Sequence, residues 1–259
     1  MYKKLLLLLW VVVLSACESN DPVSNFGNQP TLQNYYDDAQ VARKLYCPDA
    51  KCSSPSSEEK YVYSSANKLT RIEQLYRMES GKMDMSSYVD YKYNQAGLLS
   101  SKTRYGKHGF IAGWVAYESS EYEYENGVLK EEKNYFTQQQ PVQKVLTGSV
   151  LYEIRNGIKT GQKYFDGQNK LYQRVSYAYT NNVLTRETWH DGDDNVIRIF
   201  EHQFAGNRRQ IGEYLLNSRE QLALIEKIYD DKGRLISQET KVNNPLLCVM
   251  MPGILKFEY

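Results

Sequence analysis

Residues 120–127 read Ser-Glu-Tyr-Glu-Tyr-Glu-Asn-Gly and indicate the fold class of the chain. Tyr122 and Tyr124 lie two positions apart with a glutamate on each side, so one face of an extended strand would be aromatic and the other charged. Asn126 and Gly127 tolerate the positive φ that a tight hairpin turn requires. The stretch therefore predicts a half-buried β-strand that ends in a hairpin.

The same pair of positions returns along the chain at a steady interval, with Tyr in both positions in most copies and with Ile154, His202 and Lys227 as departures. Its second position falls at residues 63, 93, 124, 154, 179, 204 and 229, in steps of 30, 31, 30, 25, 25 and 25 residues. A second aromatic series keeps pace with it, at Tyr76, Tyr105, Tyr135, Tyr164, Trp189 and Tyr214. Two series with a shared spacing indicate an internal repeat of strand, turn, strand and turn.

The repeat predicts an all-β fold, an antiparallel β-meander of about seven two-strand repeats and about 14 strands. The tyrosine face needs burial, because a Phe-sized side chain gains about 1.5–3 kcal/mol on leaving water and cross-strand aromatic pairs add to this gain. A sheet of so many strands curls or splits into layers. We expect a curled or barrel-like single sheet with its aromatic face turned inward, and a two-layer sandwich is the alternative.

The best-defined repeat is Ile228-Tyr229-Asp230-Asp231-Lys232-Gly233-Arg234-Leu235-Ile236. It resembles the YD repeat of RHS-like proteins, in which a Tyr-Asp pair precedes a Gly-Arg-Leu turn and strand. Residues 93–99 fit the same frame with Asn in place of Asp, whereas residues 124–129 and 179–184 are one residue shorter in the turn. The resemblance covers residues 59–240, implies an array of β-hairpins and implies no catalytic activity.

The N-terminus has the features of an export signal. Lys3 and Lys4 precede an apolar run that ends in Leu14-Ser15-Ala16-Cys17. The run is too short to cross a bilayer as a helix, which takes about 20 residues. Leu-Ser-Ala-Cys resembles a lipobox, which implies that residues 1–16 are a lipoprotein signal peptide and that Cys17 is lipidated. An ordinary signal peptide is the alternative. We expect a lipid anchor in the outer membrane of a bacterial cell envelope, with the periplasmic or surface side left open.

The mature chain is predicted to divide into a tether and a repeat domain. Residues 17–58 are expected to be a lipidated tether with a short N-terminal segment, in which residues 31–46 form a short helix. Residues 59–259 are expected to be the β-repeat domain. Its apolar run at residues 246–255 is expected to cap the open end of the sheet, with partner binding as the alternative, and residues 255–259 to add a last strand.

The remaining cysteines have different expected roles. Cys47 and Cys52 lie in a polar segment of an exported chain, which predicts a local disulfide. A metal site is the alternative, but no His or second Cys pair lies nearby. Cys248 lies in an apolar run and is expected to be a buried free thiol.

Composition and motifs argue against several classes of function. The 32 Lys and Arg residues include Lys3 and Lys4, so the mature chain has 30 basic residues against 31 acidic ones and no electrostatic footprint for nucleic acid. Nucleophile-elbow, zinc-protease, Walker and dinucleotide-binding motifs are absent, and His108, His190 and His202 are scattered. We therefore expect no catalytic residue, no cofactor and no enzymatic activity.

A cluster of acidic residues at 191–195 has two interpretations. Its three carboxylates are of the kind that hold Ca²⁺. However, Asp166-Gly167-Gln168-Asn169-Lys170 occurs 25 residues earlier, one period of the repeat, and carries a single carboxylate. A turn explains both segments, so we expect no metal site.

Two functions remain. The first is a non-catalytic cell-envelope lipoprotein whose repeat scaffold holds or presents a protein partner. The second is a glycan-binding surface lipoprotein with ligand-facing aromatic residues, for which Trp114 and Trp189 are the candidates. The alternative for both rings is a place in the core. The expected partners are thus the membrane, through the lipid, and an unknown protein or glycan.

Overall fold

A computed structural model describes residues 40–108, 111–139, 141–215, 220–244, 246 and 252–259. These residues form sixteen strands and no helix. The strands are β1 (Arg43–Cys47), β2 (Ser57–Tyr63), β3 (Leu69–Arg77), β4 (Met83–Tyr93), β5 (Leu99–His108), β6 (Ile111–Glu125), β7 (Val128–Gln139), β8 (Val142–Arg155), β9 (Ile158–Asp166), β10 (Leu171–Thr180), β11 (Val183–Asp191), β12 (Val196–Ala205), β13 (Arg208–Tyr214), β14 (Gln221–Tyr229), β15 (Leu235–Val242) and β16 (Gly253–Glu258).

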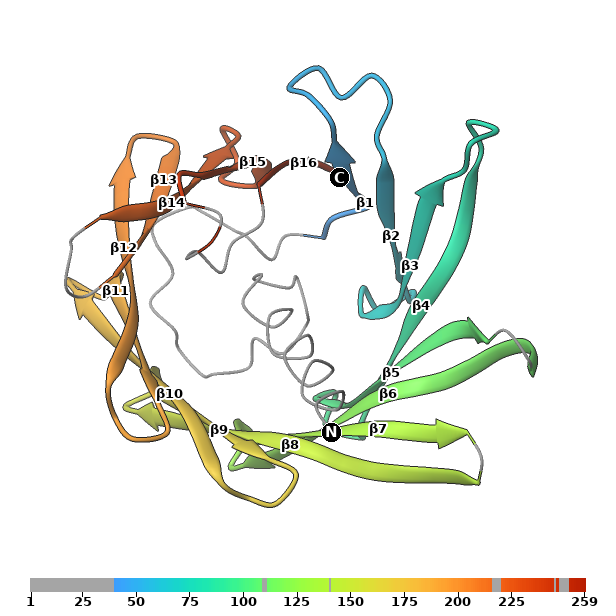
Figure 1. The fold of residues 1–259 in the computed structure, drawn as a ribbon, viewed down its shortest axis with the longest axis horizontal. Helices are drawn as coiled ribbons and strands as arrows, with labels where there is room; N and C mark the ends of the chain where they lie inside the picture. Colours follow the sequence, from blue (N-terminus) through green and yellow to red (C-terminus); the bar gives the residue numbers. More distant parts are fainter. Residues whose placement is uncertain (1–39, 109–110, 140, 216–219, 245, 247–251) are drawn as a thin grey trace, which may run out of the picture.

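The strands form one closed antiparallel barrel, seen along its axis in Figure 1. Each strand pairs with its neighbours in sequence, and β1 pairs with β16 to close the ring, with Arg43 opposite Glu258 and Cys47 opposite Ile254. The predicted all-β single sheet is confirmed, and the sandwich alternative is wrong. The seven predicted two-strand repeats correspond to β2 through β15.

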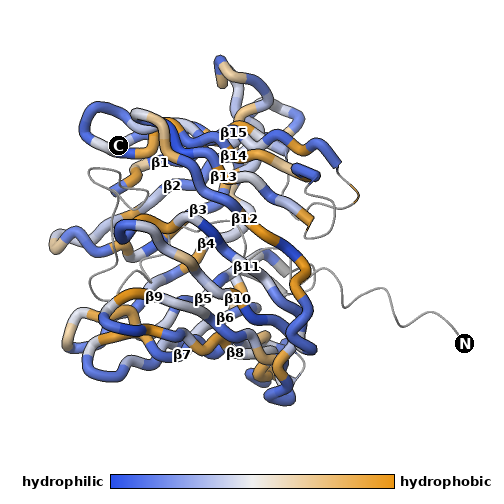
Figure 2. Tube along the Cα trace, turned by 90° about the vertical axis from the view of Figure 1, so that its left-hand side faces the viewer, coloured by the Kyte–Doolittle hydropathy of each residue, from blue (hydrophilic) through white to orange (hydrophobic). Residues whose placement is uncertain are grey.

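The connections between strands divide between the two ends of the barrel, because successive strands run in opposite directions. The turns after the even-numbered strands β2 to β14 lie at one end, which we name the turn end. The connections after the odd-numbered strands lie at the other, which we name the loop end. β1 starts and β16 finishes at the turn end, so Gln40 and Tyr259 lie there too. Figure 2 shows the barrel from the side, with hydrophilic and hydrophobic residues following one another along the strands.

The tyrosine pairs face the interior of the barrel near the turn end. Val62, on the opposite face of β2 from Tyr61, is 42% exposed, whereas Tyr61 is 8% exposed. The leucines that follow the turns pack in the same cluster as these rings. The cluster includes Tyr61, Tyr91, Tyr122, Tyr229, Leu69, Leu99, Leu129 and Leu235. The expectation of an inward aromatic face is confirmed.

A polar residue at the start of the turn accounts for the Tyr-Asp signature. The Oδ1 atom of Asp230 accepts hydrogen bonds from the backbone N–H groups of Lys232 (2.9 Å) and Arg234 (2.8 Å). Gly233 has a φ of 77°, in the left-handed region that glycine enters without steric cost. Asn94 and Gly97 repeat the arrangement in the turn after β4, where Asn94 Oδ1 accepts the N–H of Leu98 at 3.0 Å. Asp and Asn serve here as internal acceptors for turn backbone.

The barrel includes residues that the sequence assigned to the tether. β1 is a strand, so the short helix expected at residues 31–46 is wrong for residues 43–46, and residues 31–39 lie outside the described residues. β2 begins at Ser57, so the predicted domain boundary at residue 59 falls inside a strand. β1 has only five residues and lies outside the tyrosine repeat, and so short a segment has no period that separates strand from helix.

Other predictions at the ends of the chain have mixed outcomes. β16 covers most of the last strand expected at residues 255–259. Leu246 is 92% exposed, while residues 247–251, with Cys248, lie outside the described residues, as do the signal segment and Cys17. Cys47 and Cys52 are joined by a disulfide, with 4.8 Å between their Cα atoms. This bond lies in the connection between β1 and β2 at the loop end.

Replacing Asp230 with Ala should lower the free energy of unfolding by about 1–2 kcal/mol, because two backbone N–H groups lose their acceptor. Asp231→Ala is the matched control, since the neighbouring carboxylate does not accept these two bonds, and its effect should stay within about 0.5 kcal/mol. Urea denaturation of both variants measures the difference. Equal losses for the two variants would contradict the role given to Asp230.

Candidate functional site

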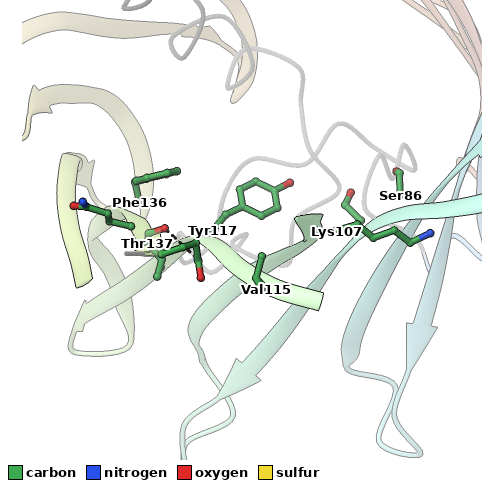
Figure 3. Close-up of a pocket in the computed structure, with 10 residues that line it drawn as sticks. Ser86, Lys107, Val115, Tyr117, Phe136 and Thr137 are labelled. Atoms are coloured by element: carbon green, nitrogen blue, oxygen red, sulfur yellow. Dashed lines mark hydrogen bonds between the residues drawn. The ribbon is translucent and has the colours of Figure 1, made fainter. Parts of the chain in front are cut away.

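The loop end of the barrel contains a pocket lined by strands β4, β5, β6 and β7. Its volume is about 560 Å³, within the range of about 300–1,000 Å³ common for small-molecule sites. β6, β7 and β8 have 15, 12 and 14 residues and are the longest strands of the barrel, so the wall is extended on this side. Figure 3 labels six of the lining residues, Ser86, Lys107, Val115, Tyr117, Phe136 and Thr137.

Two aromatic side chains, Tyr117 and Phe136, project to the same side of the sheet in the pocket (Figure 3). Tyr117 falls where the register between β5 and β6 shifts, and its ring packs over Gly106. A Cβ atom at Gly106 would lie 2.8 Å from Cε1 of Tyr117, so glycine gives this ring its space. Phe136 is 48% exposed. The ring of Tyr117 is therefore held in place by its packing over Gly106, whereas the ring of Phe136 is half exposed.

The polar side chains of the pocket are held by neighbouring strands. Ser87 Oγ donates to Gln74 Oε1 at 2.5 Å, and Ser86 Oγ donates to the backbone oxygen of Gln74 at 3.2 Å. Both hydroxyl oxygens keep the capacity to accept a hydrogen bond. Lys107 Nζ lies 3.1 Å from Asp84 Oδ2, which balances its charge. Arg104, which is hydrogen-bonded to Tyr117, is likewise paired with Glu118 at 3.3 Å. The charges next to the two rings are thus balanced, and the serine hydroxyls are able to form further hydrogen bonds.

Trp114 lies on β6 beside the pocket but faces away from it. It is adjacent to Val115, which lines the pocket, and neighbouring residues of a strand point to opposite faces. Its ring meets Tyr88 edge-on with 5.2 Å between centroids, and Lys107 Nζ lies 5.4 Å from its centroid. Tyr88 also stacks on Tyr105 at 4.7 Å. Trp114 is therefore part of an aromatic and cationic stack on the outer wall.

Trp189 lies on the inner wall, on β11. Its ring packs at 5.2 Å from Phe200, and its Nε1 donates to Glu187 Oε2 at 3.4 Å. The structure places Trp114 and Trp189 on different strands and on opposite faces of the sheet, so the two rings do not form one site.

A second polar cluster lies on the inner wall of β11, β12 and β13. His202 Nε2 is 3.1 Å from Glu187 Oε1, and Arg209 donates to His202 Nδ1 at 2.9 Å. Because a guanidinium has no acceptor, Nδ1 is the acceptor and Nε2 carries the proton that is donated to Glu187. Burial by itself raises the pKa of Glu187, but the hydrogen bonds from His202 and Trp189 outweigh it, so the pKa is lowered.

Two cations face each other on the inner wall of β13 and β14. Arg209 lies directly opposite Lys227 in the strand register, and Lys227 is 2% exposed. Burial lowers the pKa of Lys227 to about 7. Like charges directly opposite each other in a sheet are destabilising, so Lys227 in its charged form costs stability.

The acidic cluster at residues 191–195 forms the turn that the repeat predicts. Asp191 Oδ1 accepts the N–H groups of Asp193 (3.0 Å) and Asn195 (2.8 Å). Asp166 Oδ1 makes the equivalent bonds to residues 168 and 170. Within the described part of the chain, no group of three or more His, Cys, Asp or Glu side chains is placed to hold a metal ion. None of the described segments is a helix long and apolar enough to cross a membrane.

Comparison with known proteins finds remote structural similarity alone. No family model and no curated protein matches the chain. A porin-like protein from Bacteroides uniformis is 9% identical, with 87% of this chain and 98% of that one covered and a TM-score of 0.40. A protein of unknown function from Bacteroides fragilis is 14% identical over 54% of this chain and 95% of that one, with a TM-score of 0.35. The TcdB2-TccC3-TEV structure is 12% identical over 79% of this chain and 12% of that one, with a TM-score of 0.27. Similarities this remote assign no function.

The aromatic periods of the sequence do not reveal the pocket, although the sequence contains one signal for it. Tyr135 and Phe136 are adjacent aromatics in a strand, so they must point to opposite faces. Tyr135 belongs to the second aromatic series, and Phe136 therefore occupies the other face. The register shift that turns Tyr117 toward Phe136 follows no sequence period, and it is visible only in the paired strands.

Replacing Lys227 with Met should stabilise the protein, and more so at low pH. The folded pKa of about 7 lies below the usual 10.5, so the unfolded state binds more protons between these two pH values and stability of the native chain rises with pH across that window. The gain from Lys227→Met should be roughly 3 kcal/mol larger at pH 6 than at pH 9.5.

Denaturation at pH 6 and pH 9.5 measures this gain. Lys241→Met is the control, because the hydrogen bond from Lys241 to Glu226 on the outer wall raises the pKa of Lys241. A stabilisation by Lys227→Met that is the same at both pH values would contradict the electrostatic explanation.

Proposed function

We propose that this chain is a non-catalytic lipoprotein of the bacterial cell envelope. In this proposal the lipid on Cys17 holds it at the membrane, and the barrel is a scaffold that binds its partner at the loop end. The observation that carries the proposal is the charge on the outer wall of the barrel.

Opposite charges pair across neighbouring strands on the outer wall. A barrel wall in contact with lipid is apolar, and a charged side chain at the bilayer midplane costs up to about 2–4 kcal/mol. A wall covered by ion pairs favours water, so such a barrel needs a separate anchor, which Cys17 would supply. The pairs include Arg71–Asp90 (2.7 Å), Lys133–Glu123 (2.5 Å), Lys144–Glu121 (2.5 Å), Lys163–Glu153 (2.6 Å) and Lys241–Glu226 (2.9 Å).

The bonding of His202 supports a non-catalytic role. Its Nδ1 accepts from Arg209 and its Nε2 donates to Glu187, so the imidazole has no lone pair left to take a proton from a substrate. The Glu187–His202 pair therefore serves to fix neighbouring strands rather than to transfer protons.

The two ends of the barrel differ in a way that favours the loop end as the binding end. The turn end is lined by the tyrosine and leucine cluster on β2–β8 and β14–β16. Gln40 lies there too, and its Nε2 donates to the backbone oxygen of Asn67 at 3.3 Å. At the loop end, β7 and β8 expose apolar side chains. These are Phe136, Val142, Val145 and Leu146, with exposed fractions of 48%, 77%, 41% and 39%. Val145 and Leu146 are neighbours in β8 and point to opposite faces of the sheet, so the four residues form no single patch. Phe136, however, lines the pocket, and exposed apolar surface of this kind often marks an interaction site.

The relation to YD repeats is part of the same proposal. It is supported by the turn at residues 229–234, where Asp230 accepts two backbone bonds and Gly233 takes the left-handed conformation. These two requirements explain why Asp and Gly recur in that frame.

Replacing Cys17 with Ser should release the protein from the membrane fraction and abolish labelling by a clickable fatty acid. Cells that express the full-length chain are fractionated and washed with alkaline carbonate, which strips peripheral proteins. Cys248→Ser is the control and should keep both the label and the membrane association. A Cys17→Ser variant that stays in the carbonate-resistant fraction would mean that the barrel inserts by itself, and the proposal would then fail.

A further inference from the structure

We propose that the loop-end pocket is a binding site for a neutral saccharide, whose apolar face stacks on Phe136 and Tyr117. The inference rests on the proposed function as a binding scaffold and names the class of ligand that the loop end takes.

The two rings provide the stacking surface. Phe136 is 48% exposed, although burying a ring of this size is worth roughly 1.5–3 kcal/mol. Tyr117 lies on the same side of the sheet, in the same pocket (Figure 3). Its position is fixed by the register shift in β6 and by the space above Gly106. A ring held in place before binding reduces the entropy that association costs.

The groups around the rings suit hydroxyl groups rather than a charged ligand. Ser86 and Ser87 donate to Gln74 and can still accept hydrogen bonds, and Thr137 adds a third hydroxyl to the lining. Lys107 also lines the pocket, but its Nζ lies over Trp114 on the outer wall and 3.1 Å from Asp84. Arg104, which is hydrogen-bonded to Tyr117, is paired with Glu118 at 3.3 Å, so the charges near the rings are balanced. Neutral donors and acceptors beside aromatic rings match a sugar, which has an apolar C–H face and a rim of hydroxyls.

The closed sheet argues against an extended peptide as the ligand. A peptide commonly binds a sheet by adding a strand to an exposed edge. The sixteen described strands are each paired on both sides, so they offer no such edge. A saccharide bound through side chains does not need one.

The tryptophans expected to face a glycan do not compete for this role. Trp189 packs on Phe200 inside the barrel, and Trp114 meets Tyr88 and Lys107 on the outer wall. The glycan-binding hypothesis therefore moves from these two residues to Tyr117 and Phe136.

The test uses the mature chain, purified in detergent with its lipid, and isothermal titration calorimetry. Maltotriose, cellotriose, xylotriose and tri-N-acetylchitotriose are the neutral probes, and trigalacturonate is the acidic one. At least one neutral probe should bind saturably to the wild type. Phe136→Ala should weaken its binding roughly tenfold, since it removes a stacking ring worth about 1.4 kcal/mol.

Gly106→Ala provides a second, independent variant that removes no ring. Its added Cβ displaces Tyr117, so binding should weaken several-fold, as for a lost ring. Tyr172→Ala is the matched control, because Tyr172 is an exposed ring on β10, away from the pocket. Circular dichroism and melting temperature establish that each variant is folded.

Three results would overturn the assignment: no binding of any neutral probe, binding of trigalacturonate alone, or a folded Phe136→Ala variant that binds as tightly as the wild type. Any of these together with Cys17-dependent membrane attachment would reject the saccharide site and leave the proposed envelope function standing. Loss of Cys17-dependent attachment, in contrast, bears on the proposed function and not on the pocket.

Discussion

The pairing of β1 with β16 is the interaction on which the rest of the structure depends. Without it, the sixteen strands would form a curled sheet with unpaired N–H and C=O groups along its two edges, β1 and β16. Arg43 reinforces the closure from the outer side, because it forms ion pairs with Glu58 on β2 and with Glu258 on β16. Closure gives the sheet an inside and an outside. The tyrosines then pack in the interior of the barrel, and the ion pairs lie on an outer wall that faces water.

Much of this arrangement follows from the sequence because the repeat is strong. The Tyr-x-Tyr pairs and their turns locate β2 through β15, and the alternation in residues 120–125 assigns the inner face. Two features have no such signal. β1 lies outside the repeat, and its partner β16 is more than 200 residues away in the chain. The register also shifts just before Tyr63, Tyr93, Tyr124 and Tyr229. Such irregularities increase the twist of a sheet and favour its curling.

The site was harder to predict than the fold, since it depends on which face a residue takes after each register shift. Trp114 was a reasonable candidate by residue type, but its neighbour Val115 takes the pocket face. Tyr117 reaches the pocket through the shift in β6. The position of Arg209 opposite Lys227 on the inner wall could not be predicted either. It depends on how β13 and β14 pair, and the sequence of neither strand indicates that pairing. His202 occupies an aromatic position of the repeat, and only the fold reveals its bond to Glu187.

Hydrogen–deuterium exchange of β1 and β16 tests the closure of the barrel most directly. If the ring is closed, Arg43–Tyr46 of β1 and Ile254–Lys256 of β16 lie between two paired neighbouring strands. Their backbone amides should then exchange as slowly as those of interior strands such as β4 and β5. Fast exchange in β1 and β16, with protection kept in β4 and β5, would show an open sheet with two edges and would contradict this account.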